Sequence, residues 1–396
     1  MDRNASKLVL YVGPFSFPSG GAAARRILGN CQALQEAGFK VAVASGQPST
    51  SENLSEYKGI KVLSLDERNA EHLPRWLKRL AYFRMGSKTL EWLDSLPERP
   101  YAVILYSGYS PYLLRLIPWA KRNSVRLIFD AVEWYEPDSF FAYLSPYQLN
   151  IELAMRFLTP RVKNTITISS FLHDYYLKGG GHSLRTPPLL DVLETEWSAQ
   201  EKDRLTTMQL VYAGSPGKKD LLDRMLCAVL EAKQEGLNLK LSIAGVDQNH
   251  AGLYPSIKLF PPELVASTVK FLGVLSHDES MHLVRAADYS LLLRNVARYS
   301  RAGFPTKFVE SFSVGTPVIA NITSDMGEHL IDGATGWICE KPSPQSLKAT
   351  LFRAAKINRE KHTQMRRACR DQALRAFDYR NASSSLTQFL ETARNL

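Results

Sequence analysis

The chain has 396 residues, enough for two or three domains of ordinary size. With 45% apolar, 10% aromatic and 22% charged residues, its composition is that of a globular protein and excludes collagen-like, mucin-like and largely disordered chains. The 49 basic residues outnumber the 39 acidic ones, so the net charge of +10 favours anionic partners without choosing among phosphorylated metabolites, nucleic acids and acidic membranes.

The cysteines and the N-terminus bear on location. The four cysteines, at positions 31, 227, 339 and 369, form no CxxC pair, which argues against a disulfide scaffold or a structural zinc site and fits a reducing compartment. The first apolar stretch ends at Gly13-Pro14, too early for a signal peptide, and no apolar run is long enough for a transmembrane helix. We therefore expect a cytoplasmic protein whose membrane contact, if any, is peripheral.

Short β-rich runs alternate with helical patterns along the first half of the chain. Strands are expected at 7–13, 40–44, 60–65, 102–106, 125–129 and 165–168. Helices are expected at 22–37, 73–95, 110–122, 145–158 and 170–177. Near-continuous apolar strands separated by helices predict a parallel sheet covered on both faces.

The alternation lapses after residue 168. Three glycines at 179–181 and two prolines at 187–188 lead into a charged segment at 194–204, which indicates a linker. The βα pattern then restarts. Strands are expected at 209–213, 240–244, 269–272, 289–293, 317–320 and 336–339, followed by helices, of which the last covers 382–396. The chain is thus expected to hold two α/β halves of similar size.

Two strand-to-helix turns contain glycines suited to anion binding. Gly20 and Gly21 precede the first helix, where backbone N–H groups and the helix dipole favour an anion, although the spacing is not the GxGxxG of dehydrogenases. The second half opens with Gly214 followed by Lys218 and Lys219, cations that could pair with a diphosphate. Ordinary turn geometry and a solvated basic turn remain the alternatives.

The most informative stretch is 298–321. A loop at 303–306 opens a short helix that carries Glu310, Gly315 closes this helix, and an apolar strand follows. This stretch resembles the C-terminal half of family-4 retaining glycosyltransferases of the GT-B fold. Further pieces that match in order and spacing lie at 214–219, 271–279, 286–293, 327–328 and 332–336, with weaker similarity at 20–21, 166–169 and 187–191.

The resemblance implies two Rossmann-like, doubly wound α/β domains facing each other across a cleft, with the C-terminal helix returning to the N-terminal domain. The acceptor-binding domain would then cover 1–190 with 382–396, and the nucleotide-sugar-binding domain 205–377. The implied activity moves a sugar from a nucleoside-diphosphate sugar, most simply a UDP-sugar, to an acceptor hydroxyl with retention. The implied acceptor is a glycan, glycolipid or glycoprotein in surface polysaccharide or glycoconjugate synthesis, and no cofactor or metal is required.

The resemblance also assigns roles to single residues. Lys219, with Lys218, would pair with the diphosphate and assist its departure, the backbone of Val274 would contact the base, and Glu310 would hold the ribose hydroxyls. The loop residues that would meet the diphosphate or the sugar are Gly303, Phe304, Pro305 and Thr306. Further donor-binding candidates are Gly20, Gly21, Gly214, Arg294 and Lys307, with an ordinary surface charge as the alternative for Arg294 and Lys307.

Two positions depart from the family pattern. Ala302 stands where the family has an upstream glutamate that contacts the donor sugar, which leaves that sugar open. A His-Asp pair of the first half is replaced by a strand end followed by Asp130 and Glu133. Because the carboxyl ends of parallel strands face the ligand, we expect these two carboxylates to act as catalytic or acceptor-site groups, with capping of the next segment as the alternative.

Other readings stay open. Histidine spacings typical of a metal site are absent. The segment 73–84 has an apolar face surrounded by basic residues, which suits either peripheral contact with anionic lipid or a core-facing helix.

Two alternative functions remain open. A sugar-nucleotide epimerase of the same fold would need groups that abstract a proton from the sugar. A nucleic-acid-binding protein would fit the charge, but the sequence holds no recognition motif for it.

Overall fold

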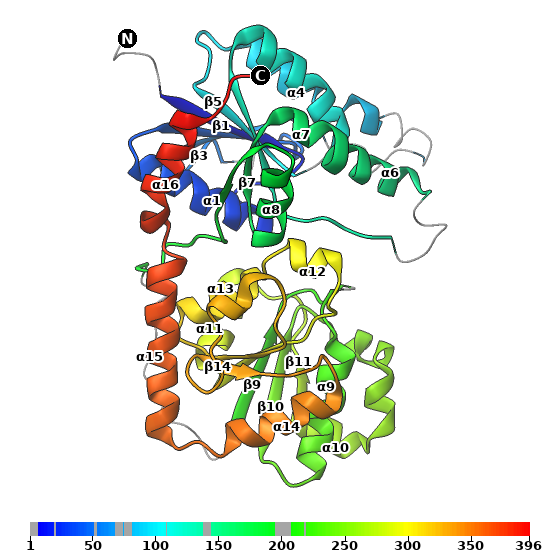
Figure 1. The fold of residues 1–396 in the computed structure, drawn as a ribbon. Coiled ribbons are helices and arrows are strands. Elements are labelled where there is room, and N and C mark those ends of the chain that lie inside the picture. Colours follow the sequence, from blue (N-terminus) through cyan, green and yellow to red (C-terminus); the bar gives the residue numbers. More distant parts are fainter. Residues whose placement is uncertain are drawn as a thin grey trace. The chain divides into compact units, whose positions relative to one another are not determined.

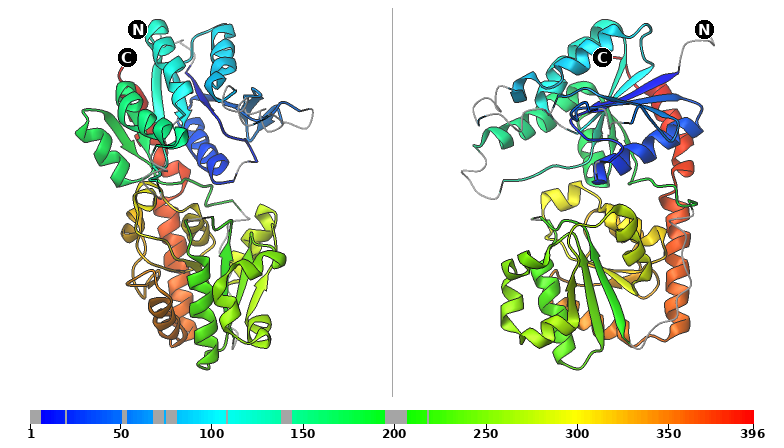
Figure 2. Two further views of the ribbon diagram at one scale, coloured as in Figure 1. Left: turned by 90° about the vertical axis from the view of Figure 1, so that its right-hand side faces the viewer. Right: turned by 180° about the vertical axis from the view of Figure 1, so that it is seen from behind.

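The computed structural model describes residues 7–19, 21–50, 54–67, 74, 81–107, 109–137, 144–194, 207–217 and 219–396. The chain divides into two compact units. Unit 1 joins Met1–Leu190 to Tyr379–Leu396, and unit 2 is Asp191–Asp378. Helices flank the sheet of each unit on both faces (Figure 1, Figure 2). Gly20, Lys218, most of the basic segment 73–84 and most of the predicted linker lie outside the described residues.

Unit 1 is built on an eight-stranded sheet with the order β3-β4-β2-β1-β5-β6-β7-β8. Its strands are β1 (Leu8–Gly13), β2 (Lys40–Ser45), β3 (Glu56–Tyr57), β4 (Ile60–Ser64), β5 (Ala102–Tyr106), β6 (Arg126–Ala131), β7 (Asn164–Thr167) and β8 (His182–Arg185). All neighbours pair in parallel except β3 with β4. The central strand β1 is buried from Val9 to Gly13, as the continuous apolar run predicts for a sheet covered on both faces.

The helices of unit 1 follow the expected alternation. They are α1 (Gly21–Glu36), α3 (Ser87–Ser95), α4 (Ser110–Asn123), α6 (Pro146–Glu152), the π-helix η1 (Leu153–Leu158), α7 (Thr159–Val162), α8 (Ser170–Lys178) and α16 (Tyr379–Thr392). The C-terminal helix α16 packs on α1, and Leu386, Phe389 and Leu390 enter the same core cluster as Ile27 and Leu34. The return of the last helix to the first half of the chain is thus confirmed.

Unit 2 holds a fully parallel sheet with the order β11-β10-β9-β12-β13-β14. Its strands are β9 (Met208–Ala213), β10 (Leu239–Ala244), β11 (Val269–Phe271), β12 (Tyr289–Leu292), β13 (Val318–Ala320) and β14 (Gly336–Ile338). Its α-helices are α9 (Leu222–Gln234), α10 (Pro262–Thr268), α11 (His277–Ala286), α12 (Arg298–Ala302), α13 (Thr306–Ser313), α14 (Pro344–Ala355) and α15 (Arg359–Ala376), and its 3₁₀ turns are Gln248–Leu253, Pro255–Leu259 and Ser324–Glu328.

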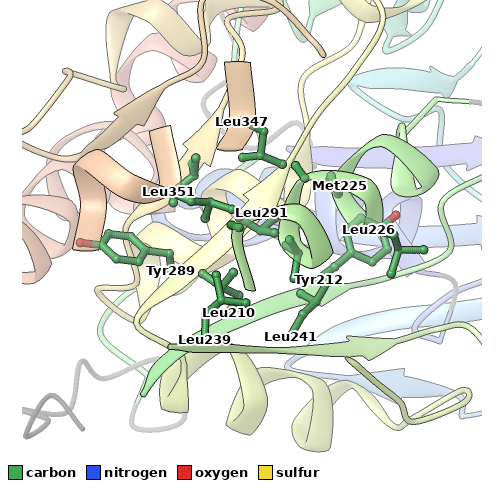
Figure 3. Close-up of a cluster of buried hydrophobic side chains, with 14 of the residues drawn as sticks. Leu210, Tyr212, Met225, Leu226, Leu239, Leu241, Tyr289, Leu291, Leu347 and Leu351 are labelled. Carbon is green, nitrogen blue, oxygen red and sulfur yellow. The ribbon is translucent and has the colours of Figure 1, made fainter. Parts of the chain in front are cut away.

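The core of unit 2 shows why these segments pack. Leu210, Leu241 and Leu291 point from three neighbouring strands to one face of the sheet, where Met225 of α9 and Leu351 of α14 meet them (Figure 3). Burial of each such side chain stabilises the folded chain by roughly 1.5–3 kcal/mol. The predicted α/β architecture of two domains with parallel sheets is confirmed. Among the described helices, none is both long and apolar enough to cross a membrane.

Candidate functional site

A cluster of charged side chains lies at the carboxyl edge of the unit 2 sheet. Asp220 follows the turn after β9, Arg294 follows β12, and Lys307 lies in the first turn of α13. The Nε atom of Arg294 donates to Asp220 Oδ1 at 2.8 Å, while the ammonium of Lys307 pairs with Oδ2 of the same carboxylate. Because parallel strands end at one edge, residues more than 70 positions apart in the sequence meet here.

Tyr212 and Asn321 complete the cluster. The hydroxyl of Tyr212 donates to Asp220 Oδ2 at 2.7 Å and accepts from Lys307 Nζ at 2.9 Å. The side chain of Asn321 bonds both backbone polar groups of Arg294, accepting from the N–H at 2.9 Å and donating to the carbonyl at 3.0 Å. These bonds fix the strand end from which the guanidinium projects.

Burial and ion pairing act in opposite directions on this cluster. Burial lowers the pKa of the Lys307 ammonium, and the attraction of Asp220 offsets only part of this effect. Burial by itself raises the pKa of Asp220, but the attraction of Lys307 and Arg294 outweighs it, so the pKa is lowered. Burial and the nearby Asp220 charge raise the pKa of Tyr212, which therefore stays a neutral hydroxyl. The side chain of Asp220 is 1% exposed, whereas those of Lys307 and Arg294 are 23% and 12% exposed. With Lys307 and Arg294 both protonated around one carboxylate, the cluster has a formal charge of +1, and only the two cations are partly exposed to solvent.

Gly214 lets the Lys307 side chain pass close to the backbone. A Cβ at this position would lie 2.3 Å from Lys307 Cε, and the φ angle of +131° is one that L side chains rarely adopt. Glycine is therefore required for the observed path of the lysine. The sequence prediction that Gly214, Arg294 and Lys307 belong to one site agrees with this geometry.

The loop at 303–306 and the helix after it also lie as the sequence predicts. Gly303, Phe304 and Pro305 are buried, and the Phe304 ring packs edge-on against Phe308 with centroids 6.0 Å apart. Helix α13 then begins at Thr306. Glu310 lies one turn after Lys307 and is 8% exposed. The loop is thus anchored by its aromatic ring, which fixes the N-terminus of α13 beside the charged cluster.

The remaining predicted residues are more dispersed. Lys219 is half-buried and directly precedes Asp220, and Val274 is 88% exposed in the turn after β11. Gly21 begins α1 in unit 1 with φ +65°. Ala302 is fully buried, so the position of the family's upstream glutamate holds a small core side chain. Their proposed contacts with a ligand remain predictions.

Asp130 lies in a buried polar network of unit 1. Its carboxylate accepts from Arg26 Nη2 at 2.7 Å and Nε at 3.0 Å and from the hydroxyl of Tyr11, which itself accepts from Asn30 at 2.9 Å. Asp130 has 0% exposure, so its carboxylate is not accessible to an acceptor, and it caps none of the described helices. This geometry does not fit the catalytic role predicted for Asp130, whereas Glu133 is half-buried.

Sequence reasoning missed six residues of these two clusters: Tyr212, Asp220 and Asn321 in unit 2, and Tyr11, Arg26 and Asn30 in unit 1. Asp220 and Tyr212 carried no motif of their own, and Tyr11 and Arg26 lie in an apolar strand and a helix where they read as core and surface residues. The one available signal was the position of Asp220 directly after two lysines. In the described part of the chain, no group of three histidine, cysteine, aspartate or glutamate residues could hold a metal ion.

Comparisons with known proteins bear on unit 2 and on the fold. Residues 194–372, which include the charged cluster, match the family model described as Glycosyl transferases group 1. No curated protein matches the sequence.

Solved structures share the whole architecture. Sucrose-phosphate synthase from Thermosynechococcus elongatus has a TM-score of 0.74 at 13% identity over 97% of this chain and 98% of that chain. HepE from Anabaena in complex with UDP has a TM-score of 0.68 at 15% identity over 97% and 99%. WaaG, a glycosyltransferase involved in lipopolysaccharide biosynthesis, has a TM-score of 0.67 at 14% identity over 97% and 100%. At such identities these similarities show the fold, which is GT-B-like, and together with the family match they support a glycosyltransferase.

Proposed function

We propose that this protein transfers a sugar from a nucleoside-diphosphate sugar to the hydroxyl of an acceptor. The observation that carries the proposal is the placement of Arg294 and Lys307 around Asp220, next to the N-terminus of α13. A diphosphate needs cationic partners, and charge-assisted hydrogen bonds to its oxygens are roughly twice as strong as neutral ones. The N–H groups at a helix N-terminus add to the same attraction.

Each donor-site residue has a chemical reason for its role. Lys307 and Lys219 pair with the diphosphate. Asp220 holds Lys307 and Arg294 in position between turnovers because it offsets the repulsion between these two cations. Glu310 accepts hydrogen bonds from two ribose hydroxyls, which a carboxylate can do at once. The exposed backbone at Val274 contacts the base, and the buried loop at 303–306 borders the sugar.

The chemical step needs no cofactor or metal. The bond between the acceptor oxygen and the anomeric carbon forms while the bond to the diphosphate oxygen breaks, and the acceptor proton passes to a departing phosphate oxygen. Attack from the face that the diphosphate leaves gives retention, as the family resemblance implies. Lys219 stabilises the charge that builds on the leaving group, where fixed cations are worth most. Glu133 is proposed to orient the acceptor.

The solved structures suggest a donor and an acceptor, and the cysteines suggest a location. We infer a UDP-sugar because HepE was solved with UDP and a trehalose-6-phosphate protein from E. coli with UDP-2-fluoro glucose, both with this fold. The acceptor class we propose is a surface glycan or glycolipid, in line with the role of WaaG. The four free cysteines suit a reducing cytoplasm.

Calorimetric titration of the full chain with UDP, GDP and ADP tests the donor site. We expect UDP to bind, and Lys307→Met to weaken this binding about tenfold to a hundredfold, since a hydrogen bond to a charged group contributes about 1.5–3 kcal/mol. Lys356→Met, at the exposed end of α14, is the matched control and should bind UDP normally. Wild-type protein that binds none of the three nucleotides would refute the proposal.

Product analysis with a UDP-sugar and a glycan acceptor tests the reaction itself. Transfer releases free UDP and a new glycoside in equal amounts. Conversion of the donor to an epimer without release of UDP would instead identify the protein as an epimerase.

A further inference from the structure

Unit 1 contains a second candidate site, remote in the fold from the carboxyl edge of its sheet. A cavity of about 420 Å³ lies where β7 begins and α8 ends, between Lys163 and Lys178. Ligands of α/β folds bind at the carboxyl ends of the strands, whereas this cavity lies at the amino-terminal edge. The cavity is therefore not part of an acceptor site at the carboxyl edge.

The lining of this cavity is basic. Lys163, Lys178 and Arg156 all line it, and none of its described lining residues is acidic. Within the described chain neither lysine forms a salt bridge, while Arg156 is held by its pairing with Glu152 and by stacking over Trp134 at 5.1 Å. Because Glu152 neutralises Arg156, the two lysines supply the net positive charge that favours an anionic ligand.

The wall of the cavity also contains a buried hydroxyl. Thr165 lines the cavity and is 1% exposed, and its Oγ1 has no hydrogen-bond partner among the described residues. A buried polar atom left without a partner costs about 1–3 kcal/mol, so an oxygen atom of a bound ligand would restore the missing bond. Two ammonium groups and a hydroxyl donor match the oxygens of a phosphate group.

An exposed apolar row leads along the helix to this cavity. Leu149 of α6 and Leu153 and Phe157 of η1 are 49%, 39% and 60% exposed. In an α-helix a step of four residues overshoots one turn of about 3.6 residues, whereas in the wider π-helix the same step falls short of a turn. The overshoot from Leu149 to Leu153 and the shortfall from Leu153 to Phe157 therefore partly cancel, so the three side chains lie in one row. Arg156, next to Phe157, lines the cavity, and Leu177, next to Lys178, is 45% exposed.

We propose that this face of unit 1 docks on an anionic lipid bilayer. The apolar row enters the boundary between headgroups and acyl chains, and the cavity holds the phosphate of a headgroup. An apolar helix face flanked by basic side chains is the arrangement that binds membrane interfaces, and each Lys or Arg near an anionic leaflet contributes about 1 kcal/mol. The docking face is distinct from the basic segment 73–84, and it does not depend on the proposed reaction.

Co-sedimentation of the full chain with lipid vesicles tests this inference. We expect binding to vesicles of phosphatidylcholine mixed with phosphatidylglycerol and much weaker binding to phosphatidylcholine alone. The double variant Lys163→Asn/Lys178→Gln should bind roughly tenfold to thirtyfold more weakly, and Phe157→Ser should also lose binding. Asparagine is chosen at 163 because it tolerates the left-handed backbone found there, φ +63°.

Matched controls separate docking from misfolding. Leu259→Ser removes an exposed apolar side chain from unit 2, and Lys356→Gln removes an exposed cation there, so both variants should bind vesicles like the wild type. All variants should keep the wild-type unfolding midpoint. Vesicle binding that is absent in the wild type, or unchanged in the double variant, overturns the proposal. Titration with glycerol phosphate provides the second arm, because lysine-dependent binding of this free phosphate without vesicle binding would identify a soluble ligand instead.

Discussion

Arg26 of α1 and Asp130 at the end of β6 form a buried ion pair, with Nη2 and Oδ1 2.7 Å apart and side chains 2% and 0% exposed. The same guanidinium donates to the carbonyl of Thr186 at 2.9 Å. The pair thus joins a helix, a strand end and the segment after β8 at a single point. A charge of this kind is retained in the interior only while its partner is present.

Asp130→Asn should therefore destabilise the protein rather than alter its chemistry alone. The amide leaves the Arg26 charge without a counter-ion in the core, and removal of one partner from a buried pair costs about 3–5 kcal/mol. Urea unfolding of the full chain measures this loss.

Glu133→Gln is the contrasting variant, because Glu133 is half-buried. We expect it to unfold close to the wild type and to lose transfer activity. An Asp130→Asn protein of wild-type stability that fails to transfer would show that Asp130 acts in the reaction after all.

Glu310→Gln should weaken binding of UDP while the fold stays intact. The neutral amide loses one acceptor facing the ribose, at an expected cost of about 1.5–3 kcal/mol. Calorimetry gives the dissociation constant, with Glu360→Gln in the exposed first turn of α15 as the control. An unchanged constant for Glu310→Gln would remove this residue from the site.

Gly214→Ala should displace the ammonium of Lys307. The new methyl group would lie 2.3 Å from Lys307 Cε, and the flexible end of the lysine is the part that can move. We expect UDP to bind about tenfold to a hundredfold more weakly, as for loss of a charge-assisted bond.

The control for this variant is Gly217→Ala, which has a positive φ of 52° but no atom within 4 Å of the added carbon. It introduces a milder strain of the left-handed backbone and leaves Lys307 in place. Equal losses of affinity in both variants would attribute the effect to strain.

Asp220 gives the fold a defined dependence on pH. Its pKa in the folded chain is lowered, so its contribution to stability is complete above the unfolded value of about 3.9 and is lost as the pH falls through the folded value. Asp220→Asn should be less stable at neutral pH and should lose less stability between about pH 5 and pH 2 than the wild type.

Urea midpoints measured from neutral to acidic buffer test this difference. Asp371→Asn, an exposed change on α15, should keep the wild-type profile. If the urea midpoints of the wild type and of Asp220→Asn fall by the same amount as the pH is lowered, other carboxylates govern acid unfolding.

Much of the fold could be read from the sequence because its signals are local. Continuous apolar runs such as Leu8–Gly13 can be buried on both faces only in a covered parallel sheet. Strand β8 was missed because His182 and Ser183 lack the apolar pattern, and the strand pairs only with β7 at the sheet edge. The helix expected over 73–95 is described from Ser87 to Ser95 as α3.

The candidate site was predictable where its residues are neighbours in sequence and not where they meet through the fold. Glycine, proline and a helix pattern reveal the loop at 303–306 and place Glu310 on the helix after it. The partnership of Asp220 with Arg294 depends on two strands ending at the same edge. The ion pair of Asp130 with Arg26 was unforeseen for the same reason, since nothing local shows that a residue of a distant helix neutralises this carboxylate.

The C-terminal helix provides the last test, because its apolar stripe completes the core of unit 1. Leu390 of α16 is fully buried in the cluster that includes Ile27 and Leu34 of α1. Leu390→Ala should lower the free energy of unfolding by about 2–5 kcal/mol, the cost of lost burial plus the cavity left behind. Leu253→Ala, whose side chain is 73% exposed in unit 2, should change it by no more than about 0.5 kcal/mol. Equal unfolding free energies for the two variants, measured in urea, would mean that α16 is dispensable for unit 1.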